Sequence, residues 1–358
     1  MKWFSRPLYP IFAGILGFSV GFTASVPASL ARSLTESLNR QLSIPLNNGT
    51  LSPQRQDADR LMQEGDRQLQ AGYVDSALTL WQEALVSYIE LGDSPAEEQV
   101  YRRLTDAYLR QGNLRSAEEM ARKQLGTARV MNDYSALVYG YNQVGSILLQ
   151  SSTAQEAEKS FVEGYRIAES VQNRGGMGLS LSNWGLAAYR QGRFEEAIAR
   201  LQDSLPLRRD VLDLAGEANT QNHLGDAYFA TGNYSRSAAA YLNGLFLGEM
   251  SQKPALMARS LGGLSVSYER LGARRDYMDT LVRQLRVAAR SNEPTQVVTA
   301  LQAFAQHSEK EKNLAAADSY YQQAIAVAQT SGDAKTAKRL QRVLDNLRAA
   351  YYFSPKVQ

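Results

Sequence analysis

Apolar residues recur along most of this chain at three- and four-residue spacing, with polar residues between them. Leu104 and Tyr108 form one such pair, and the same pair returns at Leu224 and Tyr228. This spacing places apolar side chains on one face of a helix, whereas a half-buried strand would alternate with a period of two. The hydrophobic pattern therefore predicts an all-α protein.

The pattern also repeats every 40 residues without a gap, and seven such units fit between residues 57 and 333. One column is mostly small: Ala77, Ala117, Ala157, Ala197, Ser237, Tyr277 and Ala317. A column twelve residues earlier is mostly small as well: Gly65, Thr105, Gly145, Gly185, Gly225, Ser265 and Ala305. A third column is mostly large: Trp81, Ala121, Phe161, Leu201, Tyr241, Leu281 and Tyr321. Repetition in register predicts tandem copies of one structural unit.

Each unit is predicted to be a pair of antiparallel helices of about 15–18 residues. The small columns let the two helices approach closely, and the large column fills the space beside that contact. Glycine readily takes the positive φ that ends a helix, so a glycine column marks the turn inside the unit. That column contains Gly72, Gly112, Gly192, Gly232 and Gly272. Acidic residues suit the start of the next unit, as helix caps, and they occur at Asp93, Asp133, Asp213, Glu293 and Asp333.

Three further segments flank the repeats. Residues 334–352 carry Leu340, Leu344 and Leu347 on one stripe. We predict that they form a capping helix, because a solenoid needs a terminal helix that buries its last repeat. Residues 353–358 are then a tail, and residues 32–56 are predicted to be a polar linker.

Residues 1–31 have the layout of a secretory signal peptide. Lys2 and Arg6 precede an apolar run, and small residues up to Ala28 and Ala31 fit a signal peptidase site. The run is shorter than the roughly 20 residues that a membrane-spanning helix needs. We therefore expect an exported protein, periplasmic or secreted, cleaved after Ala28 or Ala31. The alternative is an uncleaved membrane anchor formed by residues 8–31.

The composition excludes several classes of function. The chain has no Cys and two His, which rules out disulfides, thiolate metal sites and a multi-histidine metal centre. The formal net charge falls from +3 to +1 when Lys2 and Arg6 leave with the signal peptide, too little for a nucleic-acid partner. No phosphate-binding loop, nucleophile elbow or metal-binding motif occurs. We expect no enzyme activity, no cofactor and no metal.

The repeat resembles the tetratricopeptide repeat (TPR) family. The fifth unit carries Leu224, Gly225, Tyr228, Gly232 and Tyr241 at the offsets of that family's pattern. The 40-residue period is similar to the elongated TPR class of kinesin light chains and related cargo-binding proteins. The resemblance implies an α-solenoid, a right-handed superhelix of about seven helix pairs plus the capping helix.

The resemblance also implies a concave groove lined by the first helix of each unit. Carried over position by position, the partner-binding residues are Arg102, Arg103, Tyr139, Asn142, Gln143, Asn183, Tyr189, Arg190, Asn219, Asn222, His223 and Asp226. Side-chain amides carry a donor and an acceptor, so a ladder of them would grip an extended chain, while the arginines would pair with acidic groups. The alternative interpretation is an ordinary polar helix face.

These expectations define a non-enzymatic scaffold or assembly factor that binds a protein or peptide outside the cytoplasm. Similarity to exported TPR proteins of photosynthetic bacteria gives a more specific alternative, a photosystem II assembly factor. A second alternative is a structural subunit that self-associates. Membrane contact is expected only through an uncleaved N-terminal segment or a membrane-protein partner. The sequence leaves the oligomeric state open.

Overall fold

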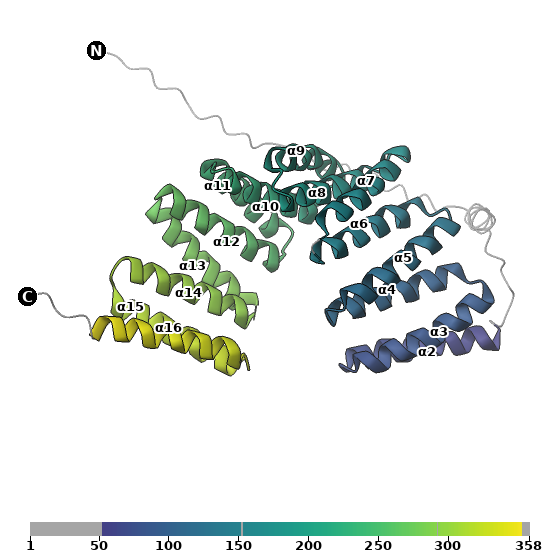
Figure 1. Cartoon of the computed structure of the whole chain (residues 1–358), viewed down its shortest axis with the longest axis horizontal. Helices are drawn as coiled ribbons and strands as arrows, with labels where there is room; N and C mark the ends of the chain where they lie inside the picture. Colours follow the sequence, from purple (N-terminus) through teal and green to yellow (C-terminus); the bar gives the residue numbers. More distant parts are fainter. Residues whose placement is uncertain (1–51, 152, 292, 353–358) are drawn as a thin grey trace, which may run out of the picture. The chain divides into compact units, whose positions relative to one another are not determined.

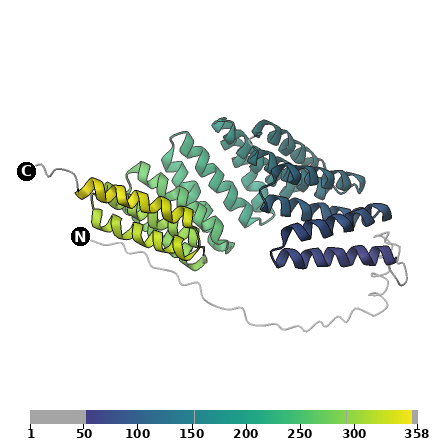
Figure 2. The same cartoon turned by 60° about the horizontal axis from the view of Figure 1, so that its bottom comes forward.

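The computed structural model describes residues 52–151, 153–291 and 293–352, and within these ranges every regular element is a helix. The helices are α2 (Pro53–Gln70), α3 (Val74–Leu91), α4 (Ser94–Arg110), α5 (Leu114–Val130), α6 (Tyr134–Gln150), α7 (Ala154–Ser170), α8 (Arg174–Arg190), α9 (Phe194–Asp210), α10 (Leu214–Ala230), α11 (Tyr234–Met250), α12 (Pro254–Leu271), α13 (Arg274–Ser291), α14 (Pro294–Lys310), α15 (Leu314–Thr330) and α16 (Ala334–Tyr352). Each helix packs on the next in chain order (Figures 1 and 2). The predicted all-α solenoid of helix pairs is therefore confirmed.

The even-numbered helices from α2 to α14 are the first helices of the seven units, and α16 covers the last unit. The first helix of the first unit, α2, begins at Pro53, and a proline is well placed in the first turn of a helix. The predicted capping helix coincides with α16, whose Leu340 and Leu344 are buried against α14 and α15. The predicted signal peptide, the tail and most of the linker lie outside the described residues.

Left-handed turn residues separate the helices at intervals of 20 residues. The predicted glycines all have positive φ, and Lys312 adopts the same conformation, with a φ of 57°. The turns between units use other residues as well, including Leu212, which has a φ of 56°. The acidic column caps helices as predicted at Asp93, Asp133, Asp213 and Asp333, each accepting a backbone N–H three residues on. Glu293 makes no such capping bond.

The small columns allow the two helices of a unit to touch. A Cβ atom built on Gly185 would lie 2.7 Å from the Leu201 side chain, and one built on Gly225 would lie 2.7 Å from the Tyr241 ring. Gly145 stands in the same relation to Phe161, whose side chain is fully buried. The glycines are therefore required by the space that the larger side chain occupies.

A second set of contacts joins first helices to one another, from α6 through α8 and α10 to α12. Three hydrogen bonds between buried side chains, each spanning 38 residues, form what we call the polar ladder. Its rungs are Asn142–Ser180 (2.8 Å), Ser182–Thr220 (3.0 Å) and Asn222–Ser260 (2.7 Å). Small residues in these positions bring the helices close enough to bond, and each buried bond contributes on the order of 1 kcal/mol.

The polar ladder stops at both ends of this run. The next pair before it is Arg102 and Gly140, and the next pair after it is Gly262 and Ala300. Neither pair makes a side-chain hydrogen bond across the helices. Among the described residues, buried hydrogen bonds of this kind therefore join first helices only from α6 to α12, whereas ion pairs nearer the surface join α2 to α4 and α12 to α14.

None of the helices within the described ranges is both long and apolar enough to cross a membrane. This finding does not extend to residues 1–51, where the expected signal peptide or anchor lies.

Two glycines test the packing between paired helices. Gly145→Ala places a methyl group against Phe161 and should lower the free energy of unfolding by about 1–3 kcal/mol. Gly126→Ala, on α5, meets no atom within 4 Å and should raise it by about 1 kcal/mol through helix propensity alone. Urea unfolding followed by circular dichroism measures both. Equal effects of the same sign would contradict the packing role of Gly145.

Candidate functional site

The structure places the predicted amide residue Asn142 inside a helix contact. Its Nδ2 donates to the Val138 carbonyl oxygen and to Ser180 Oγ, both at 2.8 Å, and its side chain is 3% exposed. Asn183 Nδ2 donates to Asn142 Oδ1 at 2.8 Å. Asn142 is thus held between α6 and α8, and its amide is not presented on an open groove as expected.

Asn222 occupies the equivalent position two units later and is fully buried. Its Oδ1 accepts from Ser260 Oγ, whereas its Nδ2 has no partner among the described residues. The expectation that Asn222 grips a partner is therefore replaced by a structural role, because the first helices approach too closely to leave the amide accessible. Asn219, one turn earlier on α10, is exposed.

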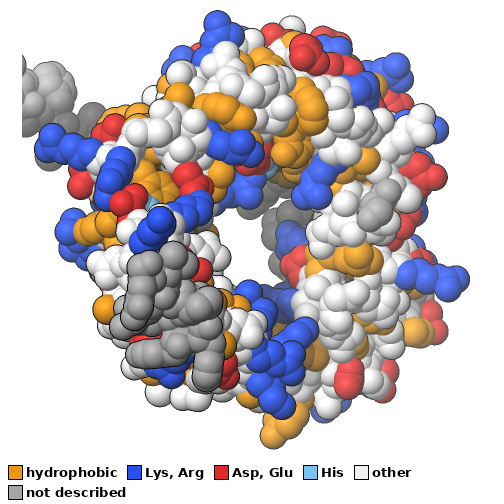
Figure 3. Space-filling model, turned by 60° about the vertical axis from the view of Figure 1, so that its left-hand side comes forward, with side chains coloured by type: hydrophobic (Ala, Val, Ile, Leu, Met, Phe, Trp, Pro, Cys, Tyr) orange, Lys and Arg blue, Asp and Glu red, His pale blue; other side chains and the backbone are white. Residues whose placement is uncertain are grey.

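The other predicted residues fall into a paired group and an exposed group. Arg103 forms a bidentate ion pair with Asp66 of α2, at 2.8 and 3.0 Å, so it links the first two units. Arg102, Tyr139 and Arg190 are exposed. In the view of Figure 3, Lys and Arg side chains, in blue, gather around the hollow of the helical unit, beside Asp and Glu side chains in red.

Three of the predicted residues meet in one cleft between α4 and α6. Arg102 lines one side, Tyr139 and Gln143 line the other, and the volume is about 650 Å³. Other polar side chains also line the cleft: Glu98, Gln99 and Asp106 of α4, Gln124 of α5, and Asp133, which caps α6. Tyr139 is 61% exposed and Arg102 has no ion pair with any described residue, so both remain available to a partner. We call this site the α4–α6 cleft.

His223 and Asp226 lie together on α10, as their spacing predicts, but each has a specific environment. Asp226 accepts from the Tyr241 hydroxyl at 2.5 Å and forms an ion pair with Arg259. The Nδ1 atom of His223 is buried without a partner. Burial, with the charge of Arg259 and two other arginines, lowers the pKa of His223 to about 3. The imidazole is neutral at physiological pH.

Tyr189 of α8 lies near this pair. Its ring packs against Phe194, with the ring centroids 5.6 Å apart. Burial raises the pKa of Tyr189, and the nearby Asp226 carboxylate raises it further. The described residues contain no group of three metal-ligating side chains. The carboxylate of Asp226 is instead held by Tyr241 and Arg259.

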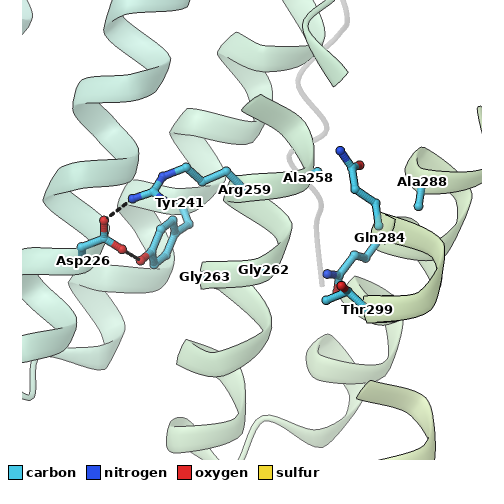
Figure 4. Close-up of a pocket in the computed structure, with 10 residues that line it drawn as sticks. Asp226, Tyr241, Ala258, Arg259, Gly262, Gly263, Gln284, Ala288 and Thr299 are labelled. Atoms are coloured by element: carbon cyan, nitrogen blue, oxygen red, sulfur yellow. Dashed lines mark hydrogen bonds and ion pairs between the residues drawn. The ribbon is translucent and has the colours of Figure 1, made fainter. Parts of the chain in front are cut away.

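A second cleft, between α12 and α14, was not predicted from the sequence. It has a volume of about 410 Å³. Asp226, Tyr241 and Arg259 are bonded together at one side, and Gln284 of α13 stands at the other (Figure 4). A sequence signal existed for this α12–α14 cleft. Gly262 takes the place of Asn142 and Asn222 in the 40-residue column, and Ala300 replaces the Ser or Thr opposite.

The comparisons with known proteins agree with this architecture. Residues 176–243 match the tetratricopeptide repeat family model. No curated protein sequence matches the chain.

Three of the similar solved structures illustrate the fold. A signal transduction ATPase with numerous domains and a tetratricopeptide repeat sensor, from Pyrococcus horikoshii, is 19% identical, with a TM-score of 0.59, over 79% of this chain and 44% of that one. The apo form of RapI is 14% identical, with a TM-score of 0.56, over 77% of this chain and 99% of that one. A Rap protein complexed with Competence and Sporulation Factor is 12% identical, with a TM-score of 0.53, over 82% of this chain and 98% of that one.

At these identities the likeness shows the fold. Residues 176–243 match the tetratricopeptide repeat family model, and the helical repeat of the described residues has the architecture of a tetratricopeptide repeat protein.

The partly buried His223, whose Nδ1 atom is shielded from solvent, gives a pH-dependent prediction. Its folded pKa of about 3 lies below the ordinary value of 6.5, so the unfolded chain binds the proton more tightly. The stability contribution is complete above pH 6.5 and is lost as the pH falls toward 3. Between about pH 7.5 and pH 4.5, the free energy of unfolding should therefore drop more in the wild type than in His223→Gln. Parallel drops in urea titrations of the two proteins would contradict the burial of this imidazole.

Proposed function

We propose that this chain is a non-enzymatic protein-binding scaffold that acts outside the cytoplasm. An extended segment of a partner protein would bind across the face formed by the first helices. The TPR architecture supports a binding role, and one similar structure is a Rap protein complexed with Competence and Sporulation Factor. The N-terminal sequence supports the location, because residues 1–31 have the layout of a signal peptide.

The α4–α6 cleft carries the binding proposal. It is open because Arg102 and Gly140 take the place of a rung of the polar ladder. Tyr139 offers a large rigid surface with a hydroxyl group, and Arg102 offers a guanidinium without a carboxylate partner in the described chain. Aromatic and arginine side chains of this kind supply most of the binding energy in protein interfaces. An extended segment that carries hydrogen-bonding groups complements such a cleft, in which Arg102 stands beside the carboxylates of Glu98, Asp106 and Asp133.

The absence of enzyme activity rests on the environment of the groups that would have to react. The partly buried His223 has no hydrogen-bond partner at Nδ1 and is surrounded by arginines, so nothing orients it as a base. Asp226 is neutralised by Arg259. Among the described residues, the polar groups of this face suit recognition better than catalysis.

The double variant Arg102→Ala with Tyr139→Ala tests the binding proposal. Both side chains are exposed, so the helical content and melting temperature should stay unchanged. Capture of the partner from the native envelope, followed by mass spectrometry, should fall at least tenfold, which corresponds to about 1.4 kcal/mol.

The matched control is Arg110→Ala with Tyr134→Ala. These residues lie on the same two helices, are exposed, and lie outside the cleft. The control protein should capture the partner as the wild type does. If the two double variants captured equal amounts, the α4–α6 cleft would not be the binding site.

Export gives a separate prediction about the N-terminus. In the native host the mature protein should begin at Ser29 or Arg32, because the small residues before these positions fit a signal peptidase. Intact-mass measurement of the protein from the envelope fraction checks this. A protein that retains Met1 would favour the anchor formed by residues 8–31.

A further inference from the structure

The α12–α14 cleft exists because one side chain of the repeat is missing. In the third and fifth units, Asn142 and Asn222 fill the space between neighbouring first helices and bond to the next helix. In the sixth unit the same column holds Gly262, and a Cβ built there meets no atom within 4 Å. The helix opposite presents Ala300, which has no polar group to offer. The space that a carboxamide occupies elsewhere in the solenoid is left open here.

Two glutamines line this space, and each has an unpaired side-chain oxygen. Gln284 of α13 and Gln296 of α14 both belong to the cleft, and the Oε1 atom of each is buried and unpaired. A buried polar atom without a partner costs about 1–3 kcal/mol. Two such atoms in one cleft of about 410 Å³ indicate a site in which a ligand supplies the missing partners.

The other polar side chains of the cleft each have a partner inside the protein, and Thr299 Oγ1 donates to the Thr295 carbonyl oxygen. Asp226 accepts from Tyr241 and from Arg259, which stand together at the far side in Figure 4. Between the two sides, Gly262 and Gly263 leave the surface of α12 free of side chains. A ligand in the open space therefore meets the two glutamine amides, together with the partly exposed Arg259 side chain.

We propose that the α12–α14 cleft binds a carboxamide side chain, Asn or Gln, of the extended partner segment. This inference rests on the proposed function and names the chemistry that the scaffold recognises. A primary amide carries both a donor and an acceptor in one plane, as Gln284 and Gln296 do. It also fits the volume that Asn142 and Asn222 fill in the other units.

Other side chains complement the site less well. A carboxylate has no donor for the buried Oε1 atoms, and an apolar side chain leaves both amides unpaired. A Lys or Arg side chain has donors but no acceptor for the amide N–H groups, and it would enter a cleft that already holds Arg259. The specificity thus follows from hydrogen-bonding capacity, the discriminator that is strongest when groups are buried.

Five capped peptides test this specificity on the full chain. Each has the sequence Ala-Ala-Xaa-Ala-Ala with an acetyl and an N-methylamide cap, so that the caps carry no primary amide, and Xaa is Asn, Gln, Asp, Lys or Leu. Side-chain NH₂ signals of ¹⁵N-labelled protein, assigned through Gln284→Met and Gln296→Met, report binding. The Asn or Gln peptide should shift both signals saturably, with a Kd at least tenfold lower than that of the other three.

Gly262→Asn gives the closing control. It restores the residue found in the third and fifth units, enters open space and improves helix propensity, so the protein should fold with an equal or higher melting temperature. It should also abolish the peptide-induced shifts. Gly126→Asn makes the same exchange on α5, away from the cleft, and should leave the shifts intact.

Three results would overturn the proposal. The glutamine NH₂ signals could stay unmoved with all five peptides, or the Asp or Leu peptide could shift them as much as the Asn or Gln peptide does. The third result would be peptide binding that survives Gly262→Asn. Each of these outcomes is independent of partner capture through Arg102 and Tyr139. If the peptide experiment fails, only the carboxamide site is disproved. The scaffold function is tested separately, by partner capture through the α4–α6 cleft.

Discussion

The structure depends on the close contact between a small residue in the first helix of a unit and a large side chain in the second. Gly145 against Phe161 and Gly225 against Tyr241 leave no room for even a methyl group. This contact recurs at 40-residue intervals in most of the units, and each helix packs on its neighbours in chain order. The turns and caps also keep the repeat in register, because they fix where each helix stops and the next begins.

Much of this architecture could be predicted from the sequence, because the contacts inside a unit are local. The glycine turn at Gly72 and the cap at Asp93 each follow from one residue and its conformational preference. The non-glycine turns are different. Leu212 takes a left-handed conformation that its side chain disfavours, and the stacking of the flanking helices holds it there. Only the period of the repeat marks that position.

The candidate site was harder to predict, because exposure depends on distances between units. Asn142 and Asn222 stand in columns that resemble a binding groove, yet Ser180 and Ser260 are small enough to let the next helix cover them. In the same two columns, the later units have Gly262 and Ala300. These small residues mark the α12–α14 cleft, which the sequence analysis did not predict. Arg102 and Tyr139 were placed correctly on an open surface because no rung of the polar ladder forms beside them.

The polar ladder also determines how the solenoid responds to force. From α6 to α12, neighbouring first helices are bonded to one another, so this stretch has two lines of attachment and resists bending. Beyond α12 and before α6 the ladder provides no such buried bond. The adjoining unit is held chiefly through a second helix, with only the exposed Lys310–Glu269 ion pair between α12 and α14. The solenoid should therefore bend more easily at the α4–α6 and α12–α14 positions than between α6 and α12. The α4–α6 cleft and the α12–α14 cleft lie at these two positions. A ligand bound in either cleft should therefore change the local curvature of the solenoid.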